Sequence, residues 1–368
     1  MSGALFAVRP QRVDVPFSDD DALAVYAART GFPVLRDRFG FLNAFSRWRL
    51  HEDALPFPSS GSTANFADLM DQRAAGIVER IRKEERDLYI LLSGGVDSTA
   101  MTMAVLRAAE GDFRHLHVVF NESTEDEYPA FVTYLCGTGI DMVRCLPHEI
   151  EDVQERLLET GYTLAGWGAD QLFGSAVSQR WPEWYHLDWK KWVAETPGIR
   201  TDAAVEQWEA AFSHYSLPVK TFGELAWFMN FATKYDIVVN SDALYSGRVT
   251  HRMINFYDTQ DFNDWSVSNF DVLHRYEQQD TQHYKIPLKD YIFAFNHDAA
   301  YRSNKGKIRS WVRAGYHEEE KYCPRAALLE TPERIVFRRE SVRRPLFDAL
   351  SLSGVMTRNL LRFYRKRA

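Results

Sequence analysis

Short apolar runs alternate with longer helical patterns between residues 88 and 165. The first run, residues 88–92 (LYILL), is continuously apolar and has the length of a strand that is buried on both faces. Strands separated by helices of about ten residues form parallel sheets through right-handed crossovers. We therefore predict an α/β fold, with a parallel sheet and helices on both of its faces. The strands are expected at residues 88–92, 115–120, 141–146 and 162–165, and the helices between them at residues 99–109, 127–135 and 148–159.

Helical periodicity dominates the rest of the chain. An amphipathic pattern occupies residues 65–85, just after a Pro, Ser, Gly and Thr-rich stretch at residues 56–63 that is typical of a linker. Beyond about residue 181 strand signals fade, and helices are expected at residues 202–213, 221–235 and 285–295. We divide the chain into a small N-terminal segment (1–70), an α/β core (71–180), a mostly helical region (181–330) and a basic tail (331–368).

The composition is that of a folded, soluble protein. Hydrophobic residues make up 45% and charged residues 26% of the 368, which excludes a disordered or collagen-like chain. No run of about 18 apolar residues occurs, so no membrane-spanning helix is expected. Cys136, Cys145 and Cys323 show no CxxC spacing and support neither a disulfide framework nor a cysteine zinc site. We expect a cytoplasmic protein.

Charge is unevenly distributed along the chain. The net charge is −7, yet residues 331–368 contain ten Lys or Arg against Glu333, Glu340 and Asp348. Such a tail could bind nucleic acid or another anionic partner, or it could lie on the protein's own acidic surface. Both interpretations stay open.

The loop after the first expected strand has the residues of a phosphate-binding turn. Residues 93–98 (SGGVDS) lead directly into a helix, and the two glycines allow the backbone to approach a phosphate closely. The hydroxyls of Ser93 and Ser98 and the free N–H groups of the helix start can donate to phosphate oxygens. The carboxylate of Asp97 suits such a site only if Mg²⁺ stands between it and the phosphates.

A second glycine-rich loop follows the last expected strand. Residues 166–174 read GWGADQLFG, and Asp170 offers a second carboxylate for the same Mg²⁺, which would neutralise a departing pyrophosphate. This loop is not a dinucleotide fingerprint, because Gln171 occupies the position of the third glycine. The GxxxxGK[ST] loop of enzymes that cleave the γ-phosphate occurs nowhere in the chain.

These two loops resemble those of the asparagine synthetase family, whose synthetase domain carries SGGxDS followed by GEGxDExFGG. That domain belongs to the PP-loop ATP pyrophosphatases, which have a HUP-like fold and cleave ATP between the α and β phosphates. The resemblance covers about residues 70–310. It implies that Asp97 and Asp170 hold Mg²⁺ and that the adenine lies against the second strand end. The ATP-binding residues implied are Ser93, Gly94, Gly95, Asp97, Ser98, Leu92, Val118, Phe120, Gly168 and Asp170.

The chain departs from the family at two positions of the second loop. Trp167 and Gln171 stand where the family has glutamates. The first of these glutamates belongs to the amine-handling side of the site, so its loss puts asparagine as the product in doubt. The indole of Trp167 either stacks on a larger, flatter substrate or packs in the core.

Two later segments contain candidate catalytic residues. Residues 252–265 lie where the family carries its R-x-P-F-L-D segment, and by this likeness Asp258 and Asp261 could face the acceptor substrate. In the family a lysine after the region of residues 285–289 approaches the α-phosphate. Lys305 and Lys307 are our candidates, because a mobile ammonium suits a phosphoryl transition state. The alternative for both lysines is a solvated basic loop.

The glutamine-hydrolysing domain of many family members is not expected in this chain. That domain has a nucleophilic cysteine at its N-terminus, whereas no cysteine occurs here before Cys136 and only about 70 residues precede the first expected strand. The nitrogen donor would then be free ammonia, an amine substrate or a partner subunit.

The sequence thus predicts an ATP- and Mg²⁺-dependent carbon–nitrogen ligase that forms AMP. It would activate a carboxylate or carbonyl of a small-molecule acceptor for attack by ammonia or an amine, in a monomer or a homo-oligomer. The first alternative is a nucleobase-modifying PP-loop enzyme acting on tRNA, DNA or a nucleotide, with the basic tail as its docking segment. The second is a non-catalytic nucleotide-binding relative, prompted by the two missing glutamates.

Overall fold

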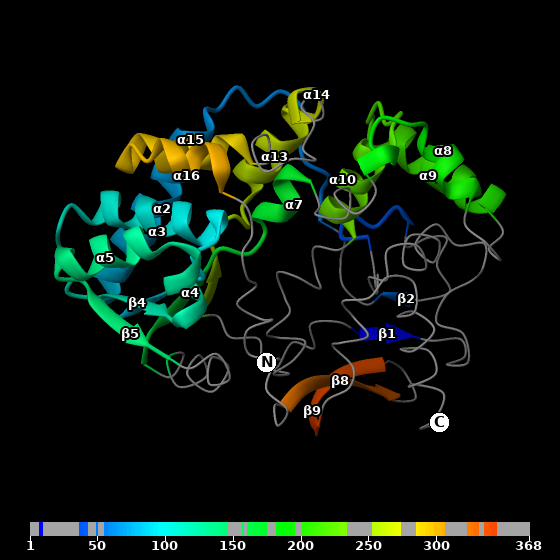
Figure 1. Ribbon diagram of the computed structural model, residues 1–368. Coiled ribbons are helices and arrows are strands. Elements are labelled where there is room, and N and C mark those ends of the chain that lie inside the picture. Colours follow the sequence, from blue (N-terminus) through cyan, green and yellow to red (C-terminus); the bar gives the residue numbers. More distant parts are fainter. Residues whose placement is uncertain are drawn as a thin grey trace. The chain divides into compact units, whose positions relative to one another are not determined.

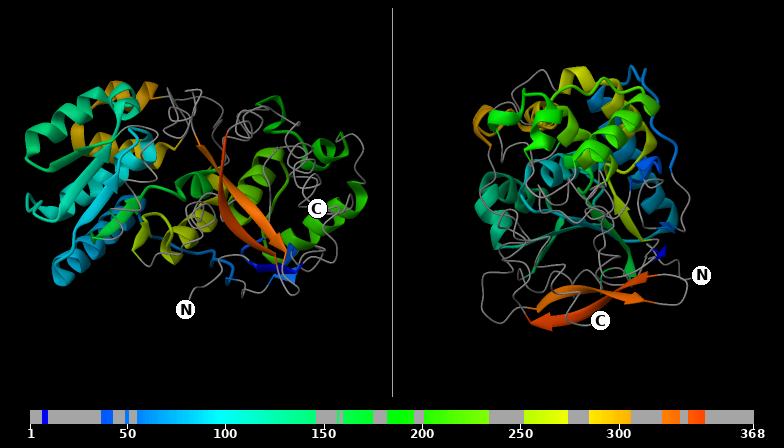
Figure 2. Two further views of the ribbon diagram at one scale, coloured as in Figure 1. Left: turned by 90° about the horizontal axis from the view of Figure 1, so that it is seen from below. Right: turned by 90° about the vertical axis from the view of Figure 1, so that its right-hand side faces the viewer.

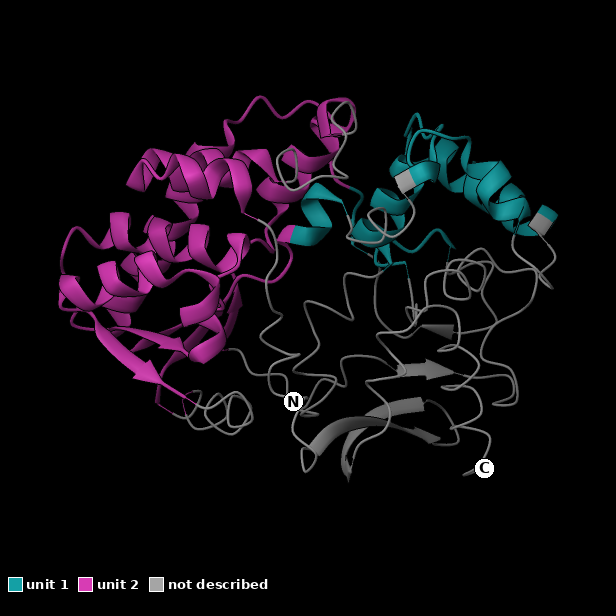
Figure 3. Ribbon diagram, in the orientation of Figure 1, with its two compact units in different colours: residues 1–57, 170–249, 322–368 teal, residues 58–169, 250–321 magenta. Residues whose placement is uncertain are grey.

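The structure, a computed structural model, describes residues 7–9, 37–42, 49–50, 55–145, 157, 160–174, 182–195, 201–233, 252–273, 285–305, 322–330 and 335–343. The chain forms two compact units, which are coloured separately in Figure 3. Unit 1 comprises residues 1–57, 170–249 and 322–368, and unit 2 comprises residues 58–169 and 250–321. Of the predicted site residues, all except Asp170 belong to unit 2.

Unit 2 is built on a five-stranded sheet in which every pair of neighbouring strands is parallel. The predicted strands are present as β3 (Leu88–Leu91), β4 (Leu116–Phe120), β5 (Asp141–Arg144) and β6 (Tyr162–Ala165). A short strand that the sequence did not indicate, β7 (Met253–Asn255), pairs with β6 and gives the order β5-β4-β3-β6-β7. The α/β class with a parallel sheet is confirmed. Its central strand is β3, which leads into the first glycine loop.

Three helices lie together on one side of this sheet (Figure 1): α2 (Phe66–Glu84), α3 (Val96–Ala109) and α15 (Ile286–Asn296). Helix α2 matches the predicted amphipathic segment, and the side chain of Asn65 accepts a hydrogen bond from the Ala67 N–H at its start. Helix α3 is buried along most of its length. It begins three residues earlier than predicted, so Asp97 and Ser98 lie in its first turn.

The helix predicted at residues 127–135 is confirmed as α5 (Pro129–Thr138), and a short helix that the sequence did not indicate, α4 (Glu122–Glu127), precedes it. Pro129 has no N–H group and disfavours helical backbone at the residue before it. Tyr128 accordingly takes φ −150° and ψ 71° and separates the two helices. The other helices among the described residues of unit 2 are α13 (Gln260–Ser268), α14 (Phe270–Leu273) and α16 (Ala299–Asn304).

The opposite face of the sheet carries a small apolar cluster. Its buried members are Leu91, Val119, Cys145 and Ala165, against which Tyr89, Val143, Leu157, Trp167 and Met253 pack. The helix predicted at residues 148–159 would cover this face, but apart from residue 157 it lies outside the described residues. Helices on both faces therefore stay a prediction.

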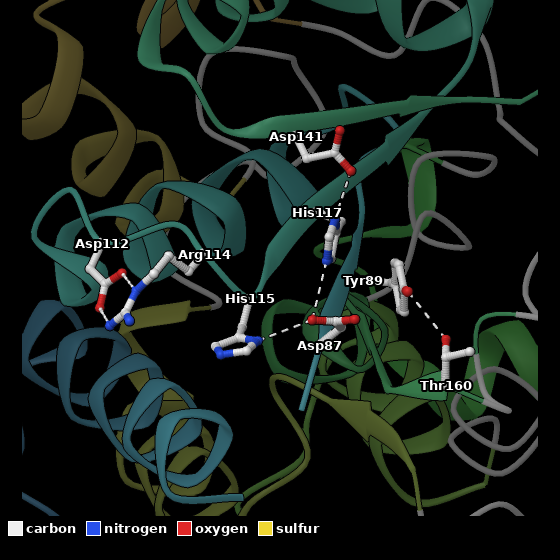
Figure 4. A network of polar contacts seen from close by, with 8 residues as sticks. All are labelled: Asp87, Tyr89, Asp112, Arg114, His115, His117, Asp141 and Thr160. Atoms are coloured by element: carbon white, nitrogen blue, oxygen red, sulfur yellow. Dashed lines mark hydrogen bonds and ion pairs between the residues drawn. The ribbon is translucent and has the colours of Figure 1, made fainter. Parts of the chain in front are cut away.

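A polar network joins the amino-terminal ends of β3, β4 and β5 (Figure 4). His115 Nδ1 lies 3.1 Å from a carboxylate oxygen of Asp87, and His117 Nε2 lies 3.5 Å from the same oxygen. On its other side, His117 Nδ1 lies 2.7 Å from Asp141, while the ring of Tyr89 stacks on the imidazole at a centroid distance of 4.8 Å. This network lies at the opposite end of the strands from the glycine loops.

Unit 1 contains η3 (Pro182–Trp184), α8 (Trp189–Ala194), α9 (Thr201–His214) and α10 (Phe222–Ala232). Helices α9 and α10 confirm the predicted segments 202–213 and 221–235 to within a few residues. Helix α10 begins with a capping box, in which Thr221 and Glu224 each accept the other's backbone N–H. Fully buried Trp192, Trp208 and Trp227 fill the interior, so much of the high aromatic content is core.

Four strands of unit 1 form a second sheet that the sequence did not indicate. These are β1 (Ala7–Arg9), β2 (Arg49–Leu50), β8 (Tyr322–Glu330) and β9 (Ile335–Arg343), in the order β2-β1-β9-β8 with antiparallel pairing. The long β8–β9 hairpin is drawn in orange in Figure 2, and β9 falls in the range predicted to be a basic tail. None of the helices described here is long and apolar enough to cross a membrane.

Candidate active site

The loop after β3 has a backbone that requires glycine. Gly94 has φ +74°, in the left-handed region. A Cβ atom at Gly94 would lie 2.7 Å from Cβ of Glu127 and 3.0 Å from the carbonyl oxygen of Thr124. The turn therefore packs directly against α4, and a side chain at Gly94 would collide with it.

The two serines of this loop are hydrogen-bonded to each other. Ser93 Oγ lies 2.9 Å from Ser98 Oγ, which also accepts the N–H of Ser93 at 3.1 Å. Gly95 is the N-cap residue of α3. It has no side chain that could accept a hydrogen bond from the N–H groups of the first turn. A helix start of this kind favours an anion, to which the hydroxyls can also donate.

The carboxylate of Asp97 holds a buried lysine. Lys285 Nζ lies 2.5 Å and 2.6 Å from the two carboxylate oxygens. The lysine side chain is 3% exposed and that of Asp97 is 25% exposed. An ammonium group thus bonds both oxygens of this carboxylate. Carboxylate oxygens are a ligand type that Mg²⁺ prefers, and the role of Asp97 as a magnesium ligand stays a prediction.

Lys285 is the site residue that the sequence analysis missed. It immediately precedes α15 and has φ +53°, a conformation that residues other than glycine rarely adopt. The only sequence signal is a lysine just before a short apolar helix, which is common in chains of every function. Its partner lies 188 residues earlier, so their proximity comes from tertiary packing.

The predicted catalytic residue Lys305 is also paired with a carboxylate. Its ammonium contacts the carboxylate of Glu127 and hydrogen-bonds to the main-chain carbonyl of Glu127 at 2.8 Å. The side chains are 7% and 2% exposed, so this is a buried ion pair and not a solvated loop. Because Glu127 packs against Gly94, Lys305 belongs to the surroundings of the glycine turn. Lys307 lies outside the described residues.

The two glycine loops meet at Gly166. A Cβ at that position would lie 3.1 Å from the backbone nitrogen of Ser98 and 3.3 Å from the carbonyl carbon of Asp97. Gly168 has φ +99° and continues the turn. Between them, Trp167 packs partly buried against the apolar cluster under the sheet, which favours packing over substrate stacking for its indole.

The end of the second loop belongs to unit 1. The main-chain carbonyl of Asp170 accepts a 2.6 Å hydrogen bond from the amide of Asn230, and Gln171 is fully buried with its amide nitrogen 3.4 Å from the Asn230 oxygen. Gln171 is therefore part of the interior of unit 1. The role of Asp170 as a magnesium ligand stays a prediction.

The residues predicted to meet the adenine are core residues. Leu92 and Val118 are fully buried and Phe120 is nearly so. A nucleobase at this strand end would consequently contact main-chain atoms at these positions. Next to it, Asn121 Nδ2 and Ser123 Oγ are buried and find no hydrogen-bond partner within the described part of the chain. The sequence analysis did not single out these two polar groups.

Asp258 lies in the loop between β7 and α13. Arg73 of α2 holds this loop by donating to the carbonyl oxygens of Phe256, at 3.1 Å, and Asn255, at 3.2 Å. Burial lowers the pKa of Arg73, and the charge of Asp258 partly opposes this shift. Asp258 and Asp261 are both exposed, so a role toward an acceptor stays a prediction.

The described residues contain no cluster of metal-binding side chains, and comparison with known proteins gives no match. Among the residues that the structure describes, no group of three or more His, Cys, Asp and Glu side chains could hold a metal ion. No protein-family model and no curated protein matches the chain.

Proposed function

We propose that this chain is an ATP- and Mg²⁺-dependent adenylating ligase of the asparagine synthetase type, which joins an acceptor carboxylate or carbonyl to ammonia or an amine. One observation supports this most. A glycine turn leads from the central parallel strand into α3, and buried lysines are held against that turn by Asp97 and Glu127. Ligands of open parallel sheets bind at this end of the strands.

In this proposal the chain binds the triphosphate with fixed dipoles and charges. The N–H groups at the start of α3 and the hydroxyls of Ser93 and Ser98 donate to phosphate oxygens. Lys305 stabilises the negative charge that grows on the α-phosphate, and Asp97 would hold Mg²⁺. The metal, when bound, would neutralise the pyrophosphate as it leaves.

The reaction has two displacement steps. An acceptor oxygen attacks the α-phosphorus, the bond from that phosphorus to the α–β bridging oxygen breaks, and pyrophosphate leaves with the electron pair. The nitrogen of ammonia or an amine then attacks the activated carbon and loses a proton while AMP leaves. Rate enhancement would come mainly from positioning and charge neutralisation.

Pyrophosphate release tests the proposal. The purified chain would be supplied with ATP and Mg²⁺ and screened with amino acids, nucleotides and nucleic acids, and AMP would be measured alongside pyrophosphate. Asp97→Asn should lower release at least about 100-fold. Asp68→Asn is a matched control, because Asp68 occupies the first turn of α2 as Asp97 does that of α3.

The outcomes separate the alternatives. Wild-type release from Asp97→Asn would contradict the assignment of the site. Release that depends on nucleic acid would select base modification, and nucleotide binding without AMP under every condition would select the non-catalytic relative.

A further inference from the structure

The short helix α16 is held at both of its ends by two consecutive residues, Glu127 and Tyr128. At its start, the Tyr128 hydroxyl donates a 3.0 Å hydrogen bond to Asp298, the N-cap residue, whose other carboxylate oxygen accepts the N–H of Tyr301 at 2.8 Å. At its end, Lys305 is the C-cap residue, and its ammonium contacts the carboxylate of Glu127 and donates to the main-chain carbonyl of Glu127 at 2.8 Å. Both attachments thus come from the break between α4 and α5.

Two stacked aromatic rings connect these attachments. The rings of Tyr128 and Tyr301 lie at a centroid distance of 4.0 Å and an interplanar angle of 24°, and both residues are buried. The ammonium of Lys305 lies 5.6 Å from the centroid of the Tyr301 ring, within the range of a cation–π interaction. Asn296 donates a 2.7 Å hydrogen bond to the Tyr128 hydroxyl. Burial, followed by the hydrogen bond to Asp298, raises the pKa of this hydroxyl, which therefore stays protonated as a donor.

The break that carries Glu127 and Tyr128 lies against the glycine turn. Pro129 begins α5, and a Cβ atom at Gly94 would lie 2.7 Å from Cβ of Glu127. An ammonium has three N–H groups, and Glu127 accepts two of those of Lys305, so the direction of the third is fixed. Because Glu127 packs on Gly94, that third N–H is held close to a phosphate bound by the turn.

We infer that Glu127 and Tyr128 form a clamp that positions Lys305 for the reaction proposed above. This inference rests on the proposed function, since it takes Lys305 as the group that stabilises the charge on the α-phosphate. Glu127 acts on the ammonium directly, and Tyr128 acts through Asp298 and Tyr301. A charge that is already fixed near the reacting group lowers the activation free energy, because no element has to be ordered during the reaction.

Hydrogen exchange measured by mass spectrometry tests the clamp without catalysis. Tyr128→Phe keeps the stacked ring and removes the hydroxyl that is bound to Asp298. The amide protons of residues 299–305 should then exchange at least about tenfold faster, because the start of α16 loses a hydrogen bond to a charged group. Tyr134→Phe is the matched control, since Tyr134 lies on α5 and is 48% exposed, and it should leave this exchange unchanged.

Steady-state kinetics test the link between the clamp and the reaction. Tyr128→Phe should lower kcat for pyrophosphate release at least about tenfold and leave KM for ATP unchanged, because a displaced ammonium is missed mainly in the transition state. Glu127→Asp keeps the charge, shortens the side chain and should behave in the same way. Added to Lys305→Gln, Tyr128→Phe should cause no further loss, since it acts only through that lysine. Tyr134→Phe should keep both constants.

Failure of the inference differs from failure of the proposed function. Unchanged exchange in Tyr128→Phe, or a further loss of kcat when it is added to Lys305→Gln, would overturn the clamp, while wild-type pyrophosphate release would leave the ligase proposal standing. A raised KM with unchanged kcat in Tyr128→Phe would overturn the positioning role in the same way. Absence of release by the wild type in the substrate screen would overturn the ligase and, with it, the positioning role.

Discussion

The hydroxyl of Tyr257 donates a 2.8 Å hydrogen bond to the main-chain carbonyl oxygen of Asp97, and so joins the loop after β7 to the first turn of α3. Tyr257 is fully buried. Burial, with a contribution from the charge of Asp97, raises the pKa of this hydroxyl well above its ordinary value. The group stays protonated as a donor, and it holds the backbone of Asp97 independently of the carboxylate.

Tyr257→Phe should therefore destabilise unit 2 by about 1 kcal/mol, because it removes a buried hydrogen bond to the carbonyl oxygen of Asp97. Urea unfolding measures the change. Tyr89→Phe is the matched control, since the hydroxyl of Tyr89 contacts Thr160 in an exposed position and its loss should cost less than about 0.5 kcal/mol. Equal stability of the two variants would contradict this role.

Gly94→Ala and Gly76→Ala should have opposite effects. At Gly94 the backbone has φ +74° and the added methyl would meet Glu127 at 2.7 Å, so we expect a loss of about 2 kcal/mol or more and weaker ATP binding. Gly76 lies within α2 with nothing within 4 Å of an added Cβ, and alanine there should stabilise by about 0.5–1 kcal/mol. Chemical denaturation and nucleotide titration check both, and a stable, ATP-binding Gly94→Ala would argue against the phosphate loop.

Variants of the Glu127–Lys305 pair can separate the effect of Lys305 on stability from its effect on pyrophosphate release. Either Glu127→Gln or Lys305→Gln leaves one buried charge without its partner and should cost about 3–5 kcal/mol, whereas the double variant should cost clearly less than the sum. Stability measurements on the four proteins give the coupling energy. Pyrophosphate release should stay low in the double variant even where stability recovers. A double variant with wild-type release would remove Lys305 from the proposed reaction.

The histidine–aspartate network at the other end of the sheet predicts that the stability of the fold decreases at acidic pH. Burial by itself raises the pKa of Asp87, but hydrogen bonds from His115 and His117 outweigh it and the pKa lies below its ordinary value of 3.8. A carboxyl group with a lowered folded-state pKa stabilises the fold above its unfolded pKa, and this contribution is lost as the pH falls through the folded value.

Wild type should thus be more stable than Asp87→Asn at about pH 6, and this difference should shrink below about pH 4. The effect should be small and sensitive to salt, because the Asp87 side chain is 37% exposed. Urea midpoints measured across this pH range, at low and high salt, provide the check. A difference that grew toward acid would show that the network is not stabilised by the Asp87 charge.

Local patterns predicted the core of unit 2 well. Four apolar runs became β3 to β6, and the amphipathic segment before them became α2. The glycine turn was also predictable, because a buried strand followed by two glycines and a helix leaves few backbone choices. The proline at residue 129 was a local signal that we did not use, and it explains why α5 begins two residues later than predicted.

Other features depended on residues far apart in the chain. Strand β7 has three residues and becomes a strand through its pairing with β6. Strand β8 falls in the region predicted to be mostly helical and β9 in the predicted basic tail, and neither carries an apolar alternation strong enough to indicate a strand. Trp167 had two equally reasonable roles until the apolar cluster against which it packs was known. Neither the pairing of these strands nor the packing of Trp167 can be predicted from a short stretch of sequence.

The sequence by itself determined strands β3 to β6, the glycine turn and the acidic residue that follows it, because apolar periodicity and backbone freedom are properties of neighbouring residues. Only the tertiary structure decided which charges face one another. Lys285 reaches Asp97 across 188 residues, and Lys305 reaches Glu127 across 178, because helices α15 and α16 fold back toward the glycine turn. Buried charges must be paired, but the partner is selected by packing in three dimensions.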